Sequence, residues 1–381
     1  MSALRRFAFV LSAILFVHFA ITVPVQAQTF TVLSNFTGSS GAYPYGGLMQ
    51  DAAGTIYGTT YYGGTSSDGT IFAVLYGAEP VLHSFSGSDG SIPKGGLIRD
   101  QNGVLYGTTQ EGGNFGLGTV FSLSSTGALT TLYSFAGGTS DGASPFGGLA
   151  RDSDGNLYGT TELGGLSGVG TVWKLDTTGT ETVLHNFSGT DGADPAYGSL
   201  LLDKTGCLYG VTAYGGPSNA GVIFRITTSG SFRVLHNFTG TDGSLVYGTP
   251  VQDSTGALYG TAAEGGKHGA GTVWRLTSSD TLTVLHNFGA AGAADGSYAL
   301  AGIVRDSTGT IYGVTYYGGS SGEGSVFKLK DGTYTPLHSF NCSSDGCYPV
   351  GALIEDKSGN LYGTAFYGGV YGDGTVWKIT P

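Results

Sequence analysis

Charged residues are scarce in this sequence, which has 381 residues of which 11% are charged. Acidic residues outnumber basic ones, 27 to 16, and the formal net charge is −11. The lysines and arginines are mostly single and widely spaced, so they form no basic patch of the kind that binds nucleic acid or anionic membrane surfaces. The composition therefore argues against a nucleic-acid partner.

Cysteine is also scarce, and three cysteines are too few for a disulfide framework or a cysteine-based zinc site. Cys342 and Cys347 nevertheless stand at the two ends of a turn-forming segment, residues 343–346, in "NCSSDGCY". A hairpin-like turn brings its ends to about the Cα separation of 5.5 Å that a disulfide prefers. We expect these two cysteines to form a disulfide in an oxidising compartment, and Cys207 to stay a free, packed thiol.

Long apolar runs are lacking except at the N-terminus. There, two arginines precede an apolar run over residues 7–23, and the small residue Ala27 follows. This is the layout of a secretory signal peptide that is cut after Ala27. The alternative is an uncleaved membrane anchor, for which the run is short. We expect residues 1–27 to be removed, which takes the net charge from −11 to −13 through the loss of the two arginines. The mature chain, 28–381, would be secreted or periplasmic, without a membrane span.

Glycine, by contrast, is abundant, with 70 residues, while the hydrophobic fraction of 40% still suffices for a core. A short "YGT"-like stretch occurs seven times, and its tyrosines are 49 to 53 residues apart. A fixed period near fifty residues indicates an array of like units. The repeated tyrosines are Tyr57, Tyr106, Tyr158, Tyr209, Tyr259, Tyr312 and Tyr362.

Each unit contains four short runs that are rich in β-branched and aromatic residues and bounded by Gly, Asp or Ser. In the third unit these runs are residues 147–152, 156–161, 170–175 and 182–187. The mature chain shows no helical periodicity. Four antiparallel strands in each of seven units, joined by short turns, predict an all-β fold, a seven-bladed β-propeller.

The two ends of the mature chain indicate how the ring closes. It begins with a fourth-strand run, residues 29–36, and ends with a third-strand run, residues 374–381. The fourth run of the last unit therefore stands at the beginning of the chain. We expect the N-terminal strand to complete the last blade and so to remove an open sheet edge.

The turn between the first two runs of each unit begins with Asp and ends with Gly. Asp can bond its own backbone two residues on, and Gly closes a tight turn. The copy at Asp152, "DSDG", begins like a calcium loop, but it has Leu157 where an EF-hand loop needs Gly. We expect a turn at each copy, and no bound metal or cofactor, since P-loop, nucleophile-elbow and zinc motifs are also missing. The turns begin at Asp51, Asp100, Asp152, Asp203, Asp253, Asp306 and Asp356.

The repeated unit resembles a known one. Residues 183–226, "VLHNFSGTDGADPAYGSLLLDKTGCLYGVTAYGGPSNAGVIFRI", are similar to the GloVer-type tandem repeat of exported bacterial proteins with a choice of anchors. The resemblance covers nearly all of residues 29–381 and is carried by seven copies. It implies export and a repeat fold, and it implies no particular activity.

Strand alternation places the long loops of all blades on one face of the propeller. These are the second-to-third loops, such as residues 162–170, and the connections between blades, such as residues 188–198. Long, variable loops on one face are where binding sites usually lie. We therefore interpret the protein as a monomeric binding scaffold for a polysaccharide or a cell-surface protein, rather than as an enzyme.

Two other functions stay open. One is a lyase- or lactonase-like enzyme at the central mouth, and the other is a structural repeat without a small ligand. An enzyme should break the repeat with unmatched acids, His or Lys that converge near the axis. Only Lys94, Lys267 and His268 begin to depart in this way, and fold analogy alone does not decide the matter.

The second-to-third loops supply most of the candidate ligand-binding residues. Their second position holds aromatic residues, which either stack on sugar rings or cover glycine-rich backbone. Two acids stand at this position, but they belong to blades two and five, and glycosidase carboxylates lie within about 10 Å of each other, so we assign no catalytic residue. The candidates from these loops are Tyr62, Glu111, Tyr214, Glu264, His268, Tyr317 and Tyr367.

The loops between blades carry Asp-Gly in six of seven copies. These aspartates either close turns or form a ring of carboxylates that binds hydroxylated ligands, and Asp191 and Asp242 are the candidates for the second role. Five histidines occupy equivalent places on outermost strands, too far apart to share a metal. We expect each to bond within its blade, to the Thr of "YGT". The histidines are His83, His185, His236, His286 and His338.

Overall fold

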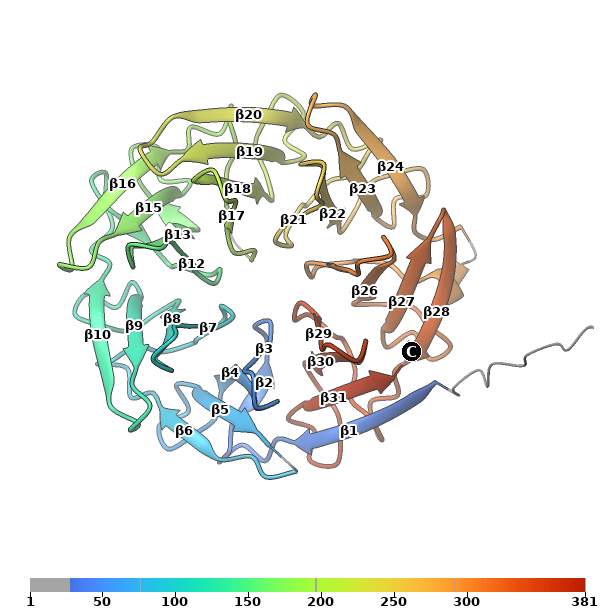
Figure 1. Ribbon diagram of the computed structural model, residues 1–381, viewed down its shortest axis with the longest axis horizontal. Helices are drawn as coiled ribbons and strands as arrows, with labels where there is room; N and C mark the ends of the chain where they lie inside the picture. The colour runs from blue at the N-terminus through green and yellow to red at the C-terminus, as the bar shows by residue number, and fades with distance from the viewer. Residues whose placement is uncertain (1–27, 76, 196, 291, 381) are drawn as a thin grey trace, which may run out of the picture.

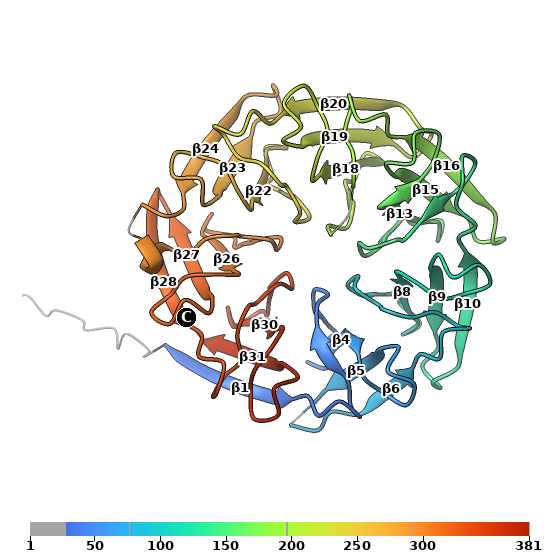
Figure 2. The ribbon, with the colours of Figure 1, turned by 180° about the vertical axis from the view of Figure 1, so that it is seen from behind.

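Seven antiparallel sheets surround a central axis in the computed structural model of the protein (Figure 1). The structure describes residues 28–75, 77–195, 197–290 and 292–380, so the expected signal peptide at 1–27 lies outside the described residues. Figures 1 and 2 show the two faces of the ring. In the described part of the chain the single helical element is the 3-10 turn η1 (Gly292–Asp295). The predicted all-β, seven-bladed propeller is confirmed.

The strands of each blade step outward from the axis (Figure 1). Blade 1 holds β3 (Met49–Gln50), β4 (Ile56–Tyr62), β5 (Thr70–Val74) and β6 (Val81–Ser84), and blade 2 holds β7 (Ile98–Arg99), β8 (Leu105–Thr109), β9 (Thr119–Leu123) and β10 (Leu129–Ser134). Blade 3 holds β12 (Ala150–Arg151), β13 (Leu157–Thr161), β15 (Thr171–Leu175) and β16 (Glu181–Asn186), and blade 4 holds β17 (Leu201–Leu202), β18 (Cys207–Thr212), β19 (Val222–Thr227) and β20 (Phe232–Asn237).

The remaining blades repeat this order. Blade 5 holds β21 (Val251–Gln252), β22 (Leu258–Ala262), β23 (Thr272–Leu276) and β24 (Leu282–Asn287), and blade 6 holds β25 (Val304–Arg305), β26 (Ile311–Thr315), β27 (Ser325–Lys330) and β28 (Thr333–Ser339). Blade 7 holds β29 (Ile354–Glu355), β30 (Leu361–Ala365), β31 (Thr375–Thr380) and β1 (Thr29–Asn35). Three short strands lie in the loops: β2 (Ala42–Pro44), β11 (Gly142–Ala143) and β14 (Leu163–Gly164).

The glycine of each "YGT" stretch makes room for an aromatic ring on the neighbouring strand. In blade 3, Gly159 pairs with Trp173, and a Cβ on this glycine would lie 2.4 Å from the indole ring. The corresponding distance for Gly58 and the ring of Phe72 is 2.5 Å. Both rings are completely buried. The repeated glycine is thus a packing requirement, because the ring lies directly over its Cα.

Aromatic pairs join each blade to the next. The Phe that follows each fourth strand packs on the third-strand ring of the next blade, with ring centroids 4.9 to 6.0 Å apart. Such pairs contribute about 0.5–1.5 kcal/mol beyond their buried area. The seven pairs are Phe36–Phe72, Phe85–Phe121, Phe135–Trp173, Phe187–Phe224, Phe238–Trp274, Phe288–Phe327 and Phe340–Trp377.

The ring closes through the N-terminal strand, as predicted. β1 pairs with β31 from Thr29–Thr380 to Asn35–Thr375, and Figure 1 shows the two side by side. Closure also holds at the axis, where glycines bring the backbones of neighbouring blades together. A Cβ on Gly351 of blade 7 would lie 2.7 Å from the carbonyl oxygen of Gly46 of blade 1.

The Asp-to-Gly turns are closed as expected. In the copy at Asp253, Oδ1 accepts hydrogen bonds from the N–H groups of Thr255 and Ala257, at 2.9 and 3.1 Å. The hydroxyl of Tyr259 donates to Oδ2 at 2.9 Å. Burial opposes ionisation here, but these hydrogen bonds outweigh it and lower the pKa of Asp253 to about 2. The repeated tyrosine and the repeated aspartate are therefore partners within one turn.

Candidate functional site

The second-to-third loops and the loops between blades meet on one face of the ring, which we call the long-loop face. Isolated β-bridges join the two kinds of loop in five blades, for example Ser91–Glu111 in blade 2 and Cys347–Tyr367 in blade 7. In blades 1 and 3 the short strands β2 and β11 make the same connection by pairing with β4 and β14. The loops therefore form a backbone-bonded layer, and side chains that project from this layer have fixed positions.

Each loop between blades contains a residue that is not glycine and has a φ of 54° to 60°, a strained conformation for L-residues. Backbone hydrogen bonds on both sides hold this residue. In blade 2, the N–H of Ile92 donates to the backbone carbonyl of Asp68, and the carbonyl of Ile92 accepts from the N–H of Gln110. Residue types vary around this positive-φ ring, so the sequence analysis missed it, although proline follows in five copies. Its members are Tyr43, Ile92, Ser144, Asp194, Leu245, Tyr298 and Tyr348.

A second set of side chains stands nearer the axis, just before the innermost strands. Tyr45 of blade 1 contacts Phe146 of blade 3 and Tyr197 of blade 4, with ring centroids 5.5 and 6.4 Å apart. Rings from opposite sides thus meet over the axis, and burial raises the pKa of Tyr45 well above its ordinary value. The members of this mouth ring are Tyr45, Lys94, Phe146, Tyr197, Tyr247, Leu300 and Val350.

The channel below the mouth ring is narrow. It holds a cavity of about 180 Å³ that is lined largely by glycines and other small residues of the innermost strands. Its polar side chains are few, namely Lys94, Tyr45, Tyr197, Ser199 and Thr249. The surface above the mouth ring, rather than the channel, therefore offers the larger area for a ligand.

Five tyrosines from blades 6, 7 and 1 form a continuous arc on the long-loop face. Successive ring centroids, from Tyr317 through Tyr348, Tyr367 and Tyr43 to Tyr62, are 5.8, 6.2, 5.1 and 6.2 Å apart. The three predicted members, Tyr62, Tyr317 and Tyr367, are 41%, 45% and 40% exposed. We call this set the aromatic arc. Tyr43 and Tyr348, which the sequence analysis missed, fill the spaces between them.

Lys94 of the mouth ring lies among aromatic rings and carboxylates. Its Nζ is 4.2 Å from the ring centroid of Phe146 and 4.7 Å from that of Tyr61, which suits a cation–π contact. Burial lowers the pKa of Lys94 to about 8, while the carboxylates of Glu162 and Glu111 oppose this shift. Gln110 donates a hydrogen bond to Glu162 at 3.2 Å. We call Lys94, Gln110, Glu111 and Glu162 the polar cluster.

Three other candidates lie outside the aromatic arc. Tyr214 is on blade 4 and is 40% exposed. Glu264 of blade 5 accepts a hydrogen bond from Tyr298, so its carboxylate is engaged by a neighbouring blade. His268 is exposed in the loop between β22 and β23, as is Lys267 beside it. The structure therefore brings together Tyr62, Tyr317 and Tyr367, but not these three residues.

Asp191 and Asp242 are engaged within the protein. Asp191 Oδ2 is 3.1 Å from His185 Nε2, and Asp242 Oδ2 is 2.8 Å from His236 Nε2. Their Oδ1 atoms accept hydrogen bonds that close the turn, Asp191 from the backbone N–H of Ser188 and Asp242 from that of Thr239. We place both aspartates outside the candidate site for this reason.

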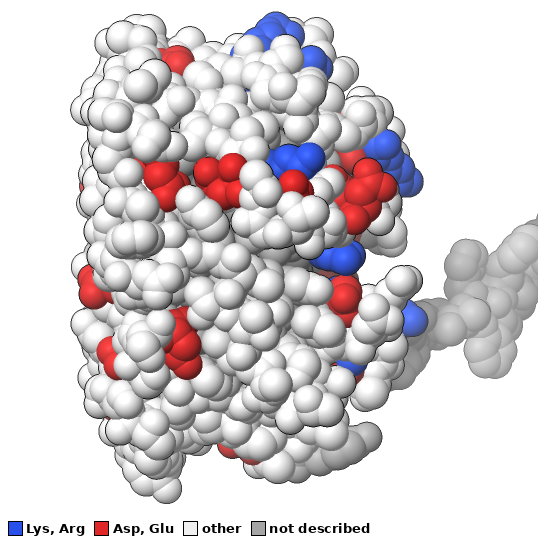
Figure 3. Space-filling view, turned by 90° about the vertical axis from the view of Figure 1, so that its left-hand side faces the viewer, with Lys and Arg blue, Asp and Glu red and all other residues white. Residues whose placement is uncertain are grey.

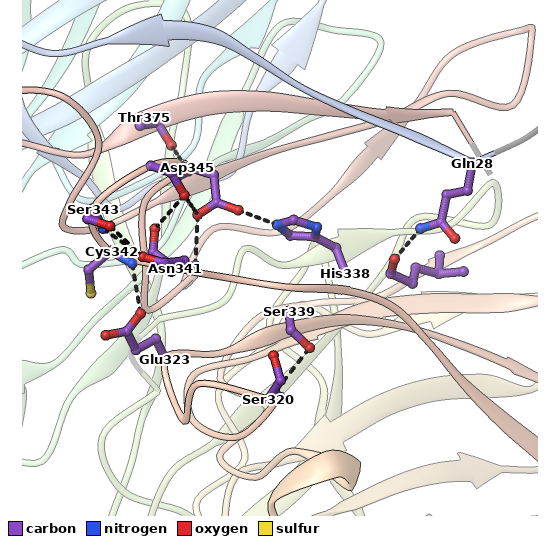
Figure 4. A network of polar contacts seen from close by, with 12 residues as sticks. Gln28, Ser320, Glu323, His338, Ser339, Asn341, Cys342, Ser343, Asp345 and Thr375 are labelled. Atoms are coloured by element: carbon purple, nitrogen blue, oxygen red, sulfur yellow. Dashed lines mark hydrogen bonds and ion pairs between the residues drawn. The ribbon is translucent and has the colours of Figure 1, made fainter.

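The expected bond from each histidine to the Thr of "YGT" is wrong. All five histidines bond the Asp of the Asp-Gly loop instead, at 2.6 to 3.1 Å, as Figure 4 shows for His338 and Asp345. In blades 1 and 5 the Thr hydroxyl is already used, since Thr59 and Thr261 donate to a backbone carbonyl of the next blade. Blades 4 and 6 have valine at this position. Burial lowers the pKa of His185, and the interaction with its Asp opposes this shift.

The cysteines are the remaining reactive side chains of the described residues. Cys342 and Cys347 are joined by a disulfide, and Cys207 is a free, partly buried thiol. Within the described ranges, no three His, Cys, Asp or Glu side chains lie close enough together to hold a metal ion. No helix in the described part of the chain has the length and apolar character needed to cross a membrane.

Charge is sparse on the outside of the ring as well. Figure 3 shows a largely uncharged surface on the side that it presents, with the basic side chains toward the right of the view and acidic side chains on both halves. Ion pairs between Arg and acids are correspondingly few, and the one recorded among the described residues joins Arg233 to Asp280.

The fold defines a seven-bladed propeller built from one repeated unit. The sequence profile of the Gloeobacter/Verrucomicrobia repeat matches residues 17–200 and again residues 195–381. The chain belongs to this repeat family, which confirms the resemblance seen in the repeated unit. No curated protein matches the sequence.

Solved structures share the fold at low identity. The extracellular domain of the putative one-component system BT4673 from B. thetaiotaomicron is 12% identical, with a TM-score of 0.59 over 90% of this chain and 39% of that chain. This chain therefore spans well under half of that structure's length. A gluconolactonase of Xanthomonas campestris, XC5397, is 12% identical, with a TM-score of 0.47 over 90% of this chain and 87% of that one. Identities this low show the fold alone.

Proposed function

We propose that the protein is exported after removal of residues 1–27 and binds a polysaccharide on its long-loop face. The observation that carries this proposal is the aromatic arc, in which three exposed tyrosines from adjacent blades are joined by two more into one surface. A sugar ring has an apolar face of C–H groups and a rim of hydroxyls. Tyrosine matches both, because its ring packs against the apolar face and its hydroxyl can bond the rim.

The geometry of the arc favours a chain of sugars over a protein surface. The arc follows the curve of the blades as a band of single rings, whereas protein partners use a wide desolvated patch surrounded by a polar rim. A band of this kind suits an extended ligand that places one residue after another on successive rings. A cell-surface protein is therefore the less favoured partner.

Preorganisation supports binding on this surface. Tyr43 and Tyr348 belong to the positive-φ ring. The N–H of Tyr348 donates to the carbonyl of Glu323 in blade 6, and its carbonyl accepts from Phe366 in blade 7. The N–H of Tyr43 donates to the carbonyl of Asp373 in blade 7, and its strand β2 pairs with β4 of blade 1. Tyrosine side chains have two rotatable bonds, so little conformational entropy is lost when a ligand orders them. An ordered aromatic surface loses less of its interaction energy on binding than a mobile one.

A propeller enzyme is the second candidate, and the polar cluster is the observation that favours it. Lys94 departs from the aromatic or aliphatic residues at the other six mouth positions, and two carboxylates interact with it. A lysine with a pKa near 8 can act as a general base. Release of lactone-opening or chain-cleavage products from candidate substrates would favour this function.

A glycan array with the mature protein, residues 28–381, tests the proposed binding. Tyr367→Ala should weaken binding to the array's ligands about tenfold, which corresponds to ~1.4 kcal/mol of lost ring contact. Tyr371→Ala is the matched control, because Tyr371 stands in the same loop but is 62% exposed and makes no ring contact with any residue that the structure describes. An array without binding, or equal effects of the two substitutions, would contradict the proposal.

A further inference from the structure

The polar cluster interrupts the aromatic surface at blades 2 and 3. Tyr61 carries the contact between the two regions, because it packs against Tyr62 of the arc at 4.2 Å and lies 4.7 Å from Lys94 Nζ. A ligand that runs along the aromatic arc from blade 6 to blade 1 would therefore meet the polar cluster next. The chemistry of this cluster decides which ligand can continue there.

Hydrogen-bonding capacity in the polar cluster is largely unused. Among the described residues, Lys94 Nζ makes no hydrogen bond and no ion pair within 4.0 Å, although it is half-buried. The carboxylate of Glu111 likewise accepts no hydrogen bond there, and that of Glu162 accepts one, from Gln110. A partly desolvated ammonium and two carboxylates with free lone pairs remain available to a ligand.

The cluster carries charges of both signs. One ammonium stands with two carboxylates. An anionic group would meet repulsion from Glu111 and Glu162, and a cationic group would leave the ammonium of Lys94 without a partner, because both have donors only. The mature chain, with a net charge of −13 after loss of residues 1–27, also disfavours a polyanion. A hydroxyl group, by contrast, both donates and accepts, so it can bond either kind of partner.

We propose that the polysaccharide is uncharged and that hydroxyl groups of its sugar at the end of the arc bond Lys94, Glu111 and Glu162. This inference rests on the proposed function, since it specifies the ligand class of the same surface. The aromatic arc supplies stacking, and the polar cluster supplies hydrogen bonds and selects against charged sugars.

The first test compares three kinds of oligosaccharide on one array: neutral hexose chains, uronate chains and glucosamine chains. The wild-type protein should bind neutral chains and not the other two, and added salt should change that affinity little, because no ligand charge is screened. Preferential binding of uronate or glucosamine chains would overturn this inference and leave the proposed function intact. Absence of binding to every glycan would overturn both.

The second test uses variants of the polar cluster. Lys94→Met keeps a long side chain among the aromatic rings but removes the donor, and it should weaken neutral-glycan binding at least about tenfold, as loss of a hydrogen bond to a charged group predicts. Lys267→Met removes an exposed lysine from a loop on the same face and should have no effect. Unchanged binding by a Lys94→Met protein that melts like the wild type would overturn the inference.

The third test is a gain of function. The double variant Glu111→Gln with Glu162→Gln leaves Lys94 as the unbalanced charge of the cluster. This variant should acquire binding to uronate chains that the wild type rejects, and high salt should abolish it. A double variant that still rejects uronates while it binds neutral chains normally would show that these carboxylates do not select against charge, and would overturn the inference.

Discussion

Alanine at Gly46 should destabilise the propeller, whereas alanine at the adjacent Gly47 should not. A Cβ on Gly46 would lie 2.8 Å from the carbonyl oxygen of Gly95 and 2.9 Å from the carbonyl oxygen of Lys94. These are backbone atoms of the next blade, so no side-chain rotation relieves the overlap. A Cβ on Gly47 would meet the Cβ of Ala352 at 3.3 Å and backbone atoms only at 3.7 Å.

The expected magnitude follows from this difference in contact. Overpacking of a tight site typically costs about 1–3 kcal/mol. Replacement of glycine by alanine also lowers the entropy of the unfolded chain, which stabilises by about 0.4–1 kcal/mol where the native backbone allows it. Both variants share this gain, so the difference between them isolates the steric cost. We expect Gly46→Ala to be about 1–3 kcal/mol less stable than Gly47→Ala.

Urea denaturation, followed by the fluorescence of the buried tryptophans, measures this difference. The midpoint should shift between the two variants at a constant slope, because both bury the same surface. The wild type serves as the reference for the entropic gain. Equal midpoints for Gly46→Ala and Gly47→Ala would refute the close approach of blades 1 and 2 at the axis, and with it the packed glycine ring.

Three further predictions follow from ring closure, from the turns and from the cysteines. Deletion of residues 29–36 should cost several kcal/mol, because β31 loses its partner and the ring opens. An unchanged melting temperature would exclude closure by β1. The pKa of Asp253 in the folded protein is about 2, below its unfolded value, so its contribution to stability is present above about pH 4 and is lost as the pH falls toward 2. Asp253→Asn should therefore flatten the pH dependence of the urea midpoint between these two pH values. A profile identical to that of the wild type would be inconsistent with the hydrogen bonds of this turn. Mass spectrometry of unreduced, alkylated peptides should find Cys342 linked to Cys347 and Cys207 alkylated; alkylation of all three would show that no bridge forms.

The repeat made most of the fold predictable. Four strand-like runs in each unit and a fixed period specify blades, and the displaced fourth run at residues 29–36 specifies how the ring closes. The Asp-to-Gly turns were equally clear, because both residues have a local reason to stand there. These features depend on short-range chemistry that every copy repeats.

The hydrogen-bond partner of each histidine was harder to predict from the sequence, because it depends on which of two possible acceptors is free. Thr59 and Thr261 donate to a backbone carbonyl of the neighbouring blade, which only the structure shows, and two of the five blades with histidine have Val211 or Val314 in place of the Thr. Comparison of the seven repeats nevertheless indicates that the partner is the aspartate of the following loop. Where Tyr133 replaces the histidine, its hydroxyl donates to Asp141, and the repeat that has Ser34 instead has no aspartate in its loop.

The aromatic arc was predicted in part for a related reason. Tyr62, Tyr317 and Tyr367 share a loop position and were identified from it. Tyr43 and Tyr348 were not, because what unites their position is a positive φ and not a residue type. Backbone hydrogen bonds to two blades impose this conformation without requiring a particular residue type, so the position is hard to recognise from the sequence.

A crystal structure of the mature protein with a neutral oligosaccharide selected on the array tests the central claim most directly. We expect sugar rings stacked along Tyr317, Tyr367 and Tyr62, with hydroxyl groups of the last sugar bonded by Lys94. A sugar bound on the opposite face, or on the long-loop face without contact to these tyrosines, would contradict the account.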